Sequence, residues 1–145
     1  ERCDRAAEEP LTVMVLDLNG FKRYNDTFGH PAGDELLRRL GAQLREAVRP
    51  EGVGYRVGGD EFVVLIGGPV TGRDVIAKRV AEAMSTRGKG FEVTAAWGLA
   101  AVPEEADTPT AALQLADVRM YAQKESRRVA SPLPDFDREA LEQRH

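Results

Sequence analysis

The chain has 145 residues, a net charge of −4, 42% hydrophobic residues and 30% charged residues. This length predicts one domain with a sizeable core. The acidic balance argues against nucleic acid or an anionic membrane as the main partner, and no apolar run approaches the ~18 residues of a membrane span. The single cysteine, Cys3, allows no internal disulfide and indicates a reducing compartment. We therefore expect a cytoplasmic domain that neither binds nucleic acid nor inserts into a membrane.

The first third of the chain predicts a buried strand followed by two helices. Residues 5–9 are typical of a helix end, and Pro10 stops that helix. The nearly continuous apolar run 11–18 is typical of a central strand covered on both faces. Residues 21–28 predict a short helix, and residues 31–48 predict a longer one. The apolar stripe of the longer helix consists of Leu36, Leu40, Leu44 and Val48.

The middle and the end of the chain predict a hairpin, two more helices and a strand. Two apolar runs around a glycine pair predict a β-hairpin over residues 55–66. A third helix is expected from residue 75, closing near Gly88. Alternating apolar residues predict a strand over 91–102 with one buried face. Small apolar residues at helical spacing predict a fourth helix over 112–129.

This order of elements predicts an α/β (α+β) sandwich in which the hairpin adds antiparallel strands to the sheet. Residues 1–130 are expected to form the domain. Residues 131–145 are charged and follow a proline-rich break, which is typical of a tail or linker. Because the chain starts without a methionine, we expect it to be a piece of a longer protein.

Two glycines and two acids stand at the centre of the sequence. Gly58-Gly59 predicts a tight turn, and Asp60 and Glu61 follow it at once. A turn without Cβ atoms lets backbone N–H groups approach a phosphate while carboxylates hold a metal. Asp17, at the end of the first strand, would face Asp60 across the sheet and share that metal. The alternatives are a solvated turn whose acids protect a strand edge, and an aspartate that caps the next helix.

Five further polar residues are candidates for binding a nucleotide. Asn25 and Asp34 together offer the donor and acceptors that match a guanine edge, although a turn residue and a first-turn acid are the alternatives. Lys22 opens a helix, where it could meet phosphate. Lys124 and Arg128 share one helix face and would bind a triphosphate, or would simply complement the helix dipole.

Taken together, these motifs resemble the GGDEF family of diguanylate cyclases over roughly residues 5–129. The matching segments are Asp17-Leu-Asn-Gly-Phe-Lys22, Asn25-Asp-Thr-Phe-Gly-His-Pro-Ala-Gly-Asp34, Gly58-Gly-Asp-Glu-Phe62, Val93-Thr-Ala-Ala-Trp-Gly-Leu-Ala100 and Asp117-Val-Arg-Met-Tyr-Ala-Gln-Lys124. Any one of them is a weak signal, whereas all of them in this order and spacing are specific.

The resemblance implies a nucleotidyl-cyclase or palm-like fold, with a central mixed antiparallel sheet flanked by helices. It implies that two GTP become cyclic di-GMP and two pyrophosphates at a two-fold homodimer interface, with Mg²⁺ or Mn²⁺, two ions per GTP, as cofactor. The implied metal ligands are Asp17, the backbone of Leu18, Asp60 and Glu61, and the last two are also the implied catalytic residues. The implied GTP-binding residues are Phe21, Lys22, Asn25, Asp34, Gly58, Gly59, Lys124 and Arg128.

The chain also departs from the family pattern. Family members usually open with a helix that this chain lacks, and a sensor domain before residue 1 and an output domain after residue 145 are expected. Many members carry an Arg-x-x-Asp product-inhibition site, and here Arg49 is present but Gly52 replaces the acid. We therefore expect that site to be absent or degenerate. The alternative functions are a regulatory module that binds GTP or cyclic di-GMP without turnover, and a cyclase or polymerase for another nucleotide, against which Asn25 and Asp34 count.

Overall fold

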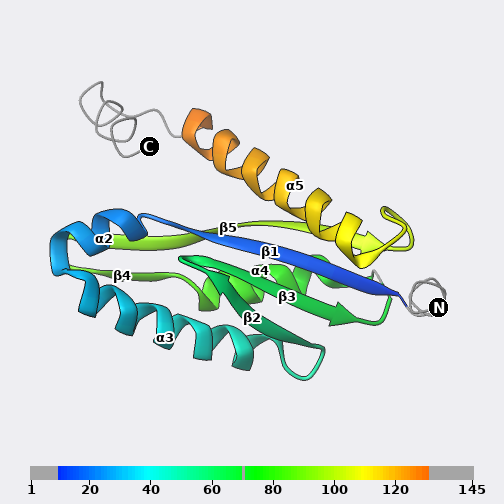
Figure 1. The fold of residues 1–145 in the computed structure, drawn as a ribbon, viewed down its shortest axis with the longest axis horizontal. Helices are drawn as coiled ribbons and strands as arrows, with labels where there is room; N and C mark the ends of the chain where they lie inside the picture. Colours follow the sequence, from blue (N-terminus) through cyan, green and yellow to red (C-terminus); the bar gives the residue numbers. More distant parts are fainter. Residues whose placement is uncertain (1–9, 70, 131–145) are drawn as a thin grey trace.

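The computed structural model of the protein describes residues 10–69 and 71–130, with side chains up to residue 126 in the last helix. These residues form an antiparallel sheet with helices on both faces (Figure 1). The strands are β1 (Leu11–Asn19), β2 (Gly52–Gly58), β3 (Glu61–Gly67), β4 (Thr86–Gly88) and β5 (Phe91–Val102). The helices are α2 (Phe21–Phe28), α3 (His30–Val48), α4 (Arg73–Ala83) and α5 (Pro109–Ala130).

The central position of β1 organises the sheet. Its strand order is β2-β3-β1-β5-β4, and every described pair of neighbours is antiparallel. The side chains from Thr12 to Leu16 are all buried, because helices cover both faces of the strand. The prediction of a central strand covered on both faces is confirmed.

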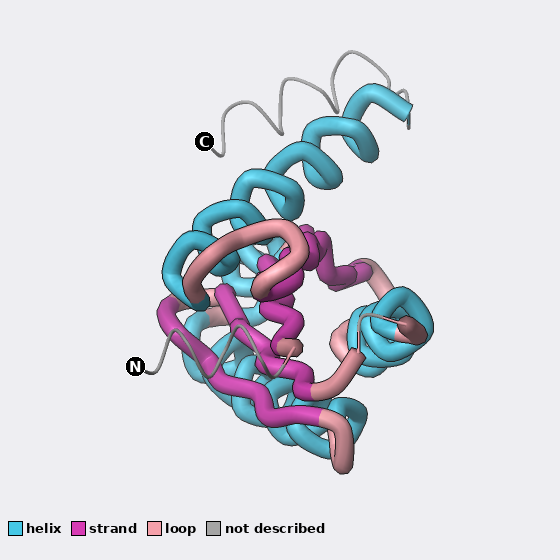
Figure 2. Tube along the Cα trace, turned by 90° about the vertical axis from the view of Figure 1, so that its right-hand side faces the viewer, coloured by secondary structure: helices cyan, strands magenta, loops and turns pink. Residues whose placement is uncertain are grey.

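The core consists of two layers, one on each face of the sheet. Figure 2 shows the strands lying between α5 and the other helices. On one face, Met14 and Leu16 of β1 pack with the leucine stripe of α3 and with α4. On the other face, Val13 and Val15 pack with Ala112, Ala116 and Met120 of α5. The amphipathic stripes predicted for α3 and α5 therefore face the core. None of the helices in the described ranges is long and apolar enough to cross a membrane.

Helix α5 lies unusually close to β5. A Cβ built on Gly98 would come within 2.2 Å of the Ala116 carbonyl oxygen and 2.4 Å of the Met120 backbone nitrogen. A residue other than glycine would push the helix off the sheet. Ala96 and Ala100, the neighbouring residues on this face of β5, are also small and buried.

Two sequence predictions about this half of the sheet are wrong. The strand over 91–102 was expected to bury one face, but Ala95 to Val102 are buried on both faces except for the half-buried Trp97. The second face bears only alanine, glycine and valine, and α5 covers it. The helix expected to close near Gly88 ends at Ala83, and β4 follows as a short strand paired with β5. The helix end predicted at residues 5–9 and the tail predicted at 131–145 lie outside the described residues.

Candidate active site

Three carboxylates come together at one end of the sheet. The register of β1 and β3 places Asp17 opposite Glu61, and Asp60 lies in the turn that precedes β3. The Leu18 backbone N–H donates to the Asp60 carbonyl oxygen over 3.2 Å. Antiparallel pairing thus brings together acids that are more than forty residues apart in the sequence, as the strand pattern predicted.

The hairpin turn beside these acids has an open backbone. Gly58 is the last residue of β2 and pairs with Glu61, so the turn itself is Gly59–Asp60. Gly59 has a φ of +30°, a backbone conformation that residues with a side chain rarely adopt. A Cβ built on either glycine would meet no described protein atom within 4 Å. Arg56 Nε donates to the Gly59 carbonyl oxygen over 2.9 Å and holds the turn. The packing around Gly58 therefore leaves its small size unexplained, whereas close approach of a ligand would explain it.

The electrostatics of the site favour a cation. Burial raises the pKa of Asp60, and the negative charge of Asp17 raises it further against the opposing effect of Lys124. Burial also raises the pKa of Glu61, with the charges of Asp117 and Asp17 acting in the same direction. The fold therefore holds the carboxylates close together, and the charge of Lys124 does not offset their burial and mutual repulsion.

Lys124 of α5 is the cation within this group. Its Nζ lies 2.8 Å from Asp17 Oδ2, and both side chains are about a quarter exposed, at 28% and 24%. The other oxygen of the same carboxylate, Asp17 Oδ1, is buried and has no hydrogen-bond partner among the described residues. A buried acceptor without a donor costs free energy, so one lysine does not satisfy the site.

The donor set fits Mg²⁺ or Mn²⁺. Both ions prefer oxygen ligands, and Mg²⁺ is commonly held by one or two carboxylates together with substrate phosphates. Asp17 and Asp60 supply two carboxylates, and the unpartnered Oδ1 is an available ligand. Within the described ranges no three His, Cys, Asp or Glu side chains have the arrangement of a complete metal centre. The protein alone thus offers a partial site, which suits an ion that arrives with phosphate oxygens.

A second polar position lies between α2 and α3. The Asn25 side chain rests against Gly33, where a built Cβ would come within 1.7 Å of Asn25 Oδ1. This Oδ1 is also buried without a hydrogen-bond partner in the described structure. Asp34 follows Gly33 in α3 and is exposed. The two predicted guanine-binding residues therefore lie at neighbouring positions on two helices.

The predicted phosphate-binding residues have different environments. Phe21 is buried at the start of α2 and belongs to the core, whereas Lys22 beside it is exposed. Gly20, in the left-handed conformation, starts this helix close to the Glu92 carbonyl oxygen of β5. Arg128 lies in the last turns of α5, and its side chain is outside the described part of the structure.

The predicted inhibitory position has no room for an acid. Arg49 is exposed at the end of α3. A Cβ built on Gly52 would lie 2.1 Å from the Leu65 carbonyl oxygen of the paired strand β3. An aspartate at this position would therefore require a shift of the backbone.

Gly33, Asp117 and Gln123 lie within the segments that carry the family resemblance, but the sequence analysis assigned no role to any of them. Gly33 makes room for Asn25, and the charge of Asp117 acts on Glu61. Gln123 accepts the Trp97 backbone N–H over 2.9 Å, through Oε1, and ties α5 to β5. For Gly33, the available signal in the sequence was a glycine inside a predicted helix, where glycine is disfavoured. The other two depend on contacts between distant elements.

The sequence that builds this site matches a family of known proteins. A sequence profile described as "Diguanylate cyclase, GGDEF domain" matches residues 1–130. The chain belongs to the GGDEF family. The resemblance inferred from the motifs is thus confirmed.

Curated relatives and solved structures agree with this assignment. The chain is 35% identical over 136 residues to diguanylate cyclase TpbB of Pseudomonas aeruginosa, covering 89% of this chain and 31% of that protein. It is 38% identical over 133 residues to the response regulator PleD of Caulobacter vibrioides, covering 84% of this chain and 29% of that protein. The chain spans less than a third of the length of these two relatives.

The solved GGDEF domains share the fold. The crystal structure of the GGDEF domain of YfiN, or TpbB, from P. aeruginosa superimposes with a TM-score of 0.72 at 36% identity, covering 86% of this chain and 84% of that one. The GGDEF domain of DgcB from Caulobacter crescentus, solved in complex with c-di-GMP, gives a TM-score of 0.67 at 27% identity, covering 86% and 78%. The palm-like cyclase fold expected from the sequence is confirmed.

Proposed function

We propose that this GGDEF domain is a diguanylate cyclase that condenses two GTP into cyclic di-GMP and releases two pyrophosphates. The observation that carries the proposal is the unsatisfied acid group beside an open glycine turn. Asp17 Oδ1 has no partner in the described structure, the pKa of Asp60 is raised, and Gly58 and Gly59 leave their outer side clear. Family membership and relatives named diguanylate cyclase support the same chemistry.

In this proposal Asp17, Asp60 and the Leu18 backbone carbonyl would hold Mg²⁺ or Mn²⁺, two ions per GTP, with Glu61 in support. When bound, the ions lower the pKa of the ribose 3′-hydroxyl and neutralise the charge that develops on the phosphates. Asp60 and Glu61 orient that hydroxyl and help to remove its proton.

The cations of the chain would bind the triphosphate. Lys124 already neutralises Asp17 and lies beside the turn, so it would contact phosphate oxygens that come to the acids. Lys22, and Arg128 one helical turn after Lys124, would add positive charge. The N–H groups of Gly58 and Gly59 would approach the same phosphates.

The polar position between α2 and α3 would select guanine, with Phe21 packing beneath it. Asn25 and Asp34 would accept and donate along the guanine edge. Adenine presents an acceptor at N1 where guanine presents a donor, so Asp34 would face it acceptor to acceptor. A mismatch of this kind costs about 1–3 kcal/mol.

Two copies of the domain would meet face to face, because each GTP supplies one nucleophile and one phosphate. The active species would then be a two-fold homodimer. A sensor domain before residue 1, an output domain after residue 145 and a cytoplasmic location complete the proposal. The relatives' greater length supports additional domains.

Inhibition by product through Arg49 would be weak or absent. One exposed arginine gives a weak, salt-sensitive attraction, and Gly52 has no room for the acid. Calorimetric titration with cyclic di-GMP should show no micromolar binding. Micromolar binding that disappears on Arg49→Ala would contradict this expectation.

The direct test is incubation of the protein with GTP and Mg²⁺ and identification of the product by mass. Cyclic di-GMP should form, and ATP at the same concentration should give no cyclic dinucleotide. If GTP binds and no product forms in a dimeric preparation, the domain is a regulatory binding module. Equal affinity for ATP and GTP would reject the roles given to Asn25 and Asp34.

A further inference from the structure

The outer edge of β5 lacks a neighbouring strand over most of its length. Among the described residues, β4 pairs with β5 only from Phe91 to Val93. Beyond these residues the backbone groups that face away from β1 alternate along the strand, at Trp97, Leu99 and Ala101. An unpaired edge of this kind needs other hydrogen-bond partners.

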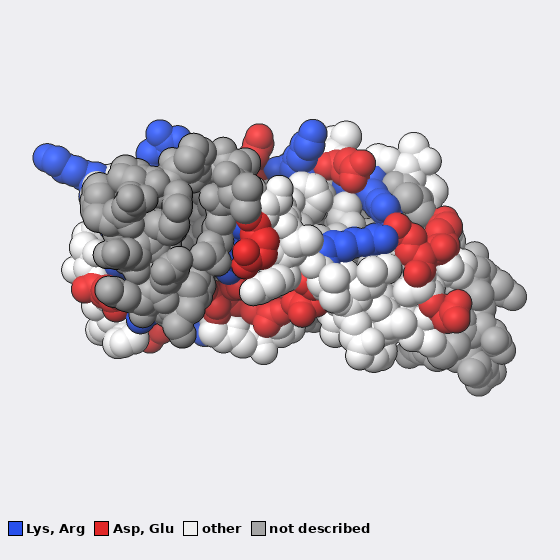
Figure 3. All heavy atoms as spheres, turned by 90° about the horizontal axis from the view of Figure 1, so that it is seen from above, with Lys and Arg blue, Asp and Glu red and all other residues white. Residues whose placement is uncertain are grey.

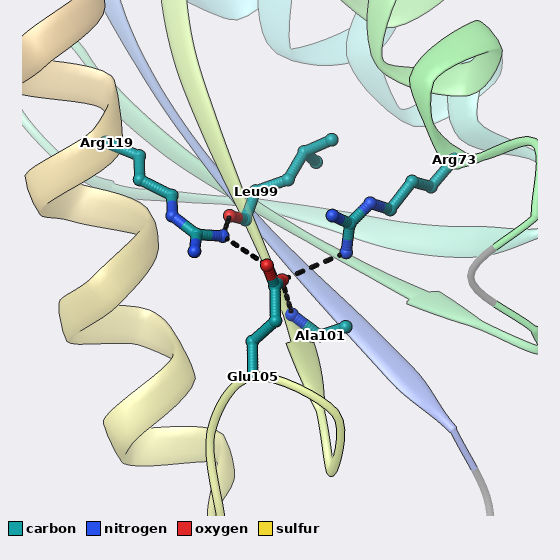
Figure 4. Close-up of polar contacts among 5 residues, drawn as sticks. All are labelled: Arg73, Leu99, Ala101, Glu105 and Arg119. Carbon is teal, nitrogen blue, oxygen red and sulfur yellow. Dashed lines mark hydrogen bonds and ion pairs between the residues drawn. The ribbon is translucent and has the colours of Figure 1, made fainter.

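Three side chains take the place of the missing strand. Gln123 Oε1 accepts the Trp97 N–H over 2.9 Å. Arg119 Nη1 donates to the Leu99 carbonyl oxygen over 2.8 Å, and Glu105 Oε1 accepts the Ala101 N–H over 3.0 Å. Figure 4 shows the last two contacts converging between α5 and β5. We call Gln123, Arg119 and Glu105 the edge ladder.

The spacing of the ladder fixes the position of α5 along the strand. Four residues of helix rise about 6 Å, and two residues of strand rise about 6.8 Å. Arg119 and Gln123, four residues apart, therefore reach backbone groups that are two residues apart on β5. A slip of the helix by one residue would break both bonds. Gly98 sets the distance between helix and strand, and the ladder sets their register.

This register determines where Lys124 lies. Trp97, the partner of Gln123, follows Ala96, and Ala96 is paired with Asp17 across the sheet. Lys124 follows Gln123 in α5 and turns about 100° around the helix from it, toward Asp17. The hydrogen bond between Trp97 and Gln123 therefore anchors α5 one residue away from the ion pair between Lys124 and Asp17, both along the helix and along the strand.

We propose that Gln123 is a positioning residue for nucleotide binding, acting through Lys124, with Arg119 and Glu105 as the more distant supports. The inference rests on the proposed function, because it takes Lys124 to bind the phosphates of GTP. Gln123 itself touches the strand and not the substrate. Its loss lets the C-terminal half of α5 move, and Lys124 then meets the phosphates less often in the productive geometry.

A double-mutant cycle tests this proposal. The variants are Gln123→Ala, Lys124→Met and their combination, and the measurement is the affinity for 3′-deoxy-GTP, which lacks the attacking hydroxyl, in the presence of Mg²⁺. Gln123→Ala should weaken binding about tenfold in the wild-type background and less than about twofold in the Lys124→Met background. Gln123→Glu keeps the acceptor for the Trp97 N–H and should restore most of the affinity.

Two further variants keep the test decisive. Gln114→Ala makes the same change at an exposed position of α5 and should leave the affinity unchanged. If urea unfolding shows that Gln123→Ala is not folded, Arg119→Met replaces it in the same mutant cycle, because Arg119 makes the neighbouring contact of the edge ladder. An equal loss of affinity in both Lys124 backgrounds would overturn the positioning role. By contrast, no binding to the wild-type protein, or full binding to Lys124→Met, would count against the proposed function itself.

Discussion

Two clusters of charged side chains contact α5 at different points: one holds a single carboxylate, Glu105, and the other holds Asp17, Asp60 and Glu61. The two differ in how far hydrogen-bond donors satisfy their acids. Glu105 uses both oxygens, because Oε1 accepts from the Ala101 N–H and from Arg73 at 3.1 Å, and Oε2 accepts from Arg119 at 2.9 Å. Burial acts to raise the pKa of Glu105, but these hydrogen bonds outweigh it and hold the pKa below its ordinary value. Figure 4 shows the acid enclosed by its partners.

The acids of the other cluster lack the hydrogen-bond donors and positive charge that would satisfy them. Asp17, Asp60 and Glu61 lie near Lys124, which is paired with Asp17, and the pKa values of Asp60 and Glu61 are raised. Each cluster combines at least one carboxylate with a basic residue of α5, so residue type does not distinguish them. The balance of donors does, because a saturated acid holds the fold together whereas an unsaturated one is available to a ligand.

This distinction is local, because the pattern of charge on the face seen from the α5 side does not reveal it. On the face seen from the α5 side, in the part not drawn grey, basic and acidic side chains are interspersed (Figure 3). Water and dissolved salt screen exposed charges on such a surface, so each ion pair there contributes little to stability. The two clusters stand out only when individual hydrogen bonds are traced.

The largest expected effect is a loss of cyclase turnover when an acid of the Asp17, Asp60 and Glu61 cluster is changed. Asp60→Asn should lower cyclase turnover roughly a thousandfold or more, because a ligand of the proposed metal is lost while the shape is kept. The measurement is the rate of cyclic di-GMP formation. Asp74→Asn, at an exposed position of α4, is the matched control and should retain wild-type turnover. Wild-type turnover in Asp60→Asn would remove Asp60 from the metal site.

The next effect is opposite in sign for the two clusters. In metal-free buffer near neutral pH, Glu105→Gln should lower the free energy of unfolding by about 1–3 kcal/mol, because hydrogen bonds to a charged acceptor are lost. Asp60→Asn should raise it by about 0.5 kcal/mol, because one of the mutually repelling charges is removed. Urea unfolding of both variants measures the difference. A destabilised Asp60→Asn would show that Asp60 is structural, and the comparison between the clusters would collapse.

The smallest effect is the acid dependence of stability at Glu105. Because its folded pKa lies below the ordinary value of 4.5, the charged form is favoured by folding. Its contribution is complete above the unfolded pKa and is lost as the pH falls through the folded value. Urea midpoints of wild type and Glu105→Gln should therefore differ near neutral pH and converge as the pH falls through the folded pKa, below 4.5. A constant difference at every pH would assign the effect to packing and not to charge.

The sequence predicted the proximity of Asp17 and Asp60 better than the contacts of Glu105. Asp17 ends a strongly apolar strand, and Asp60 follows a glycine turn, so each acid stands where neither strand propensity nor burial favours it. Glu105 follows Glu104 in a loop rich in acids, and nothing local distinguishes the two. Its partners Arg119 and Arg73 are 14 and 32 residues away, and only the folded register brings them together.

The same reasoning explains the errors in the sheet. In β5, large apolar residues alternate with Ala96, Gly98 and Ala100. This pattern predicts a strand with one buried face, because residues this small do not by themselves indicate burial. These residues are small because α5 lies against them, which requires knowledge of the tertiary contact. The strand β4 was missed because three residues, Thr86 to Gly88, are too few to show a period.

The position of Trp97 makes the domain its own optical reporter. It is the single tryptophan of the chain, and its backbone N–H is bonded to Gln123 beside the residue paired with Asp17. Its half-buried indole also packs against the core on the face opposite α5. Intrinsic fluorescence, without any label, should therefore respond both to movement of α5 and to loosening of the opposite layer. A spectrum that changes when metal and nucleotide are added to the folded protein would show that α5 or the opposite layer has moved around Trp97.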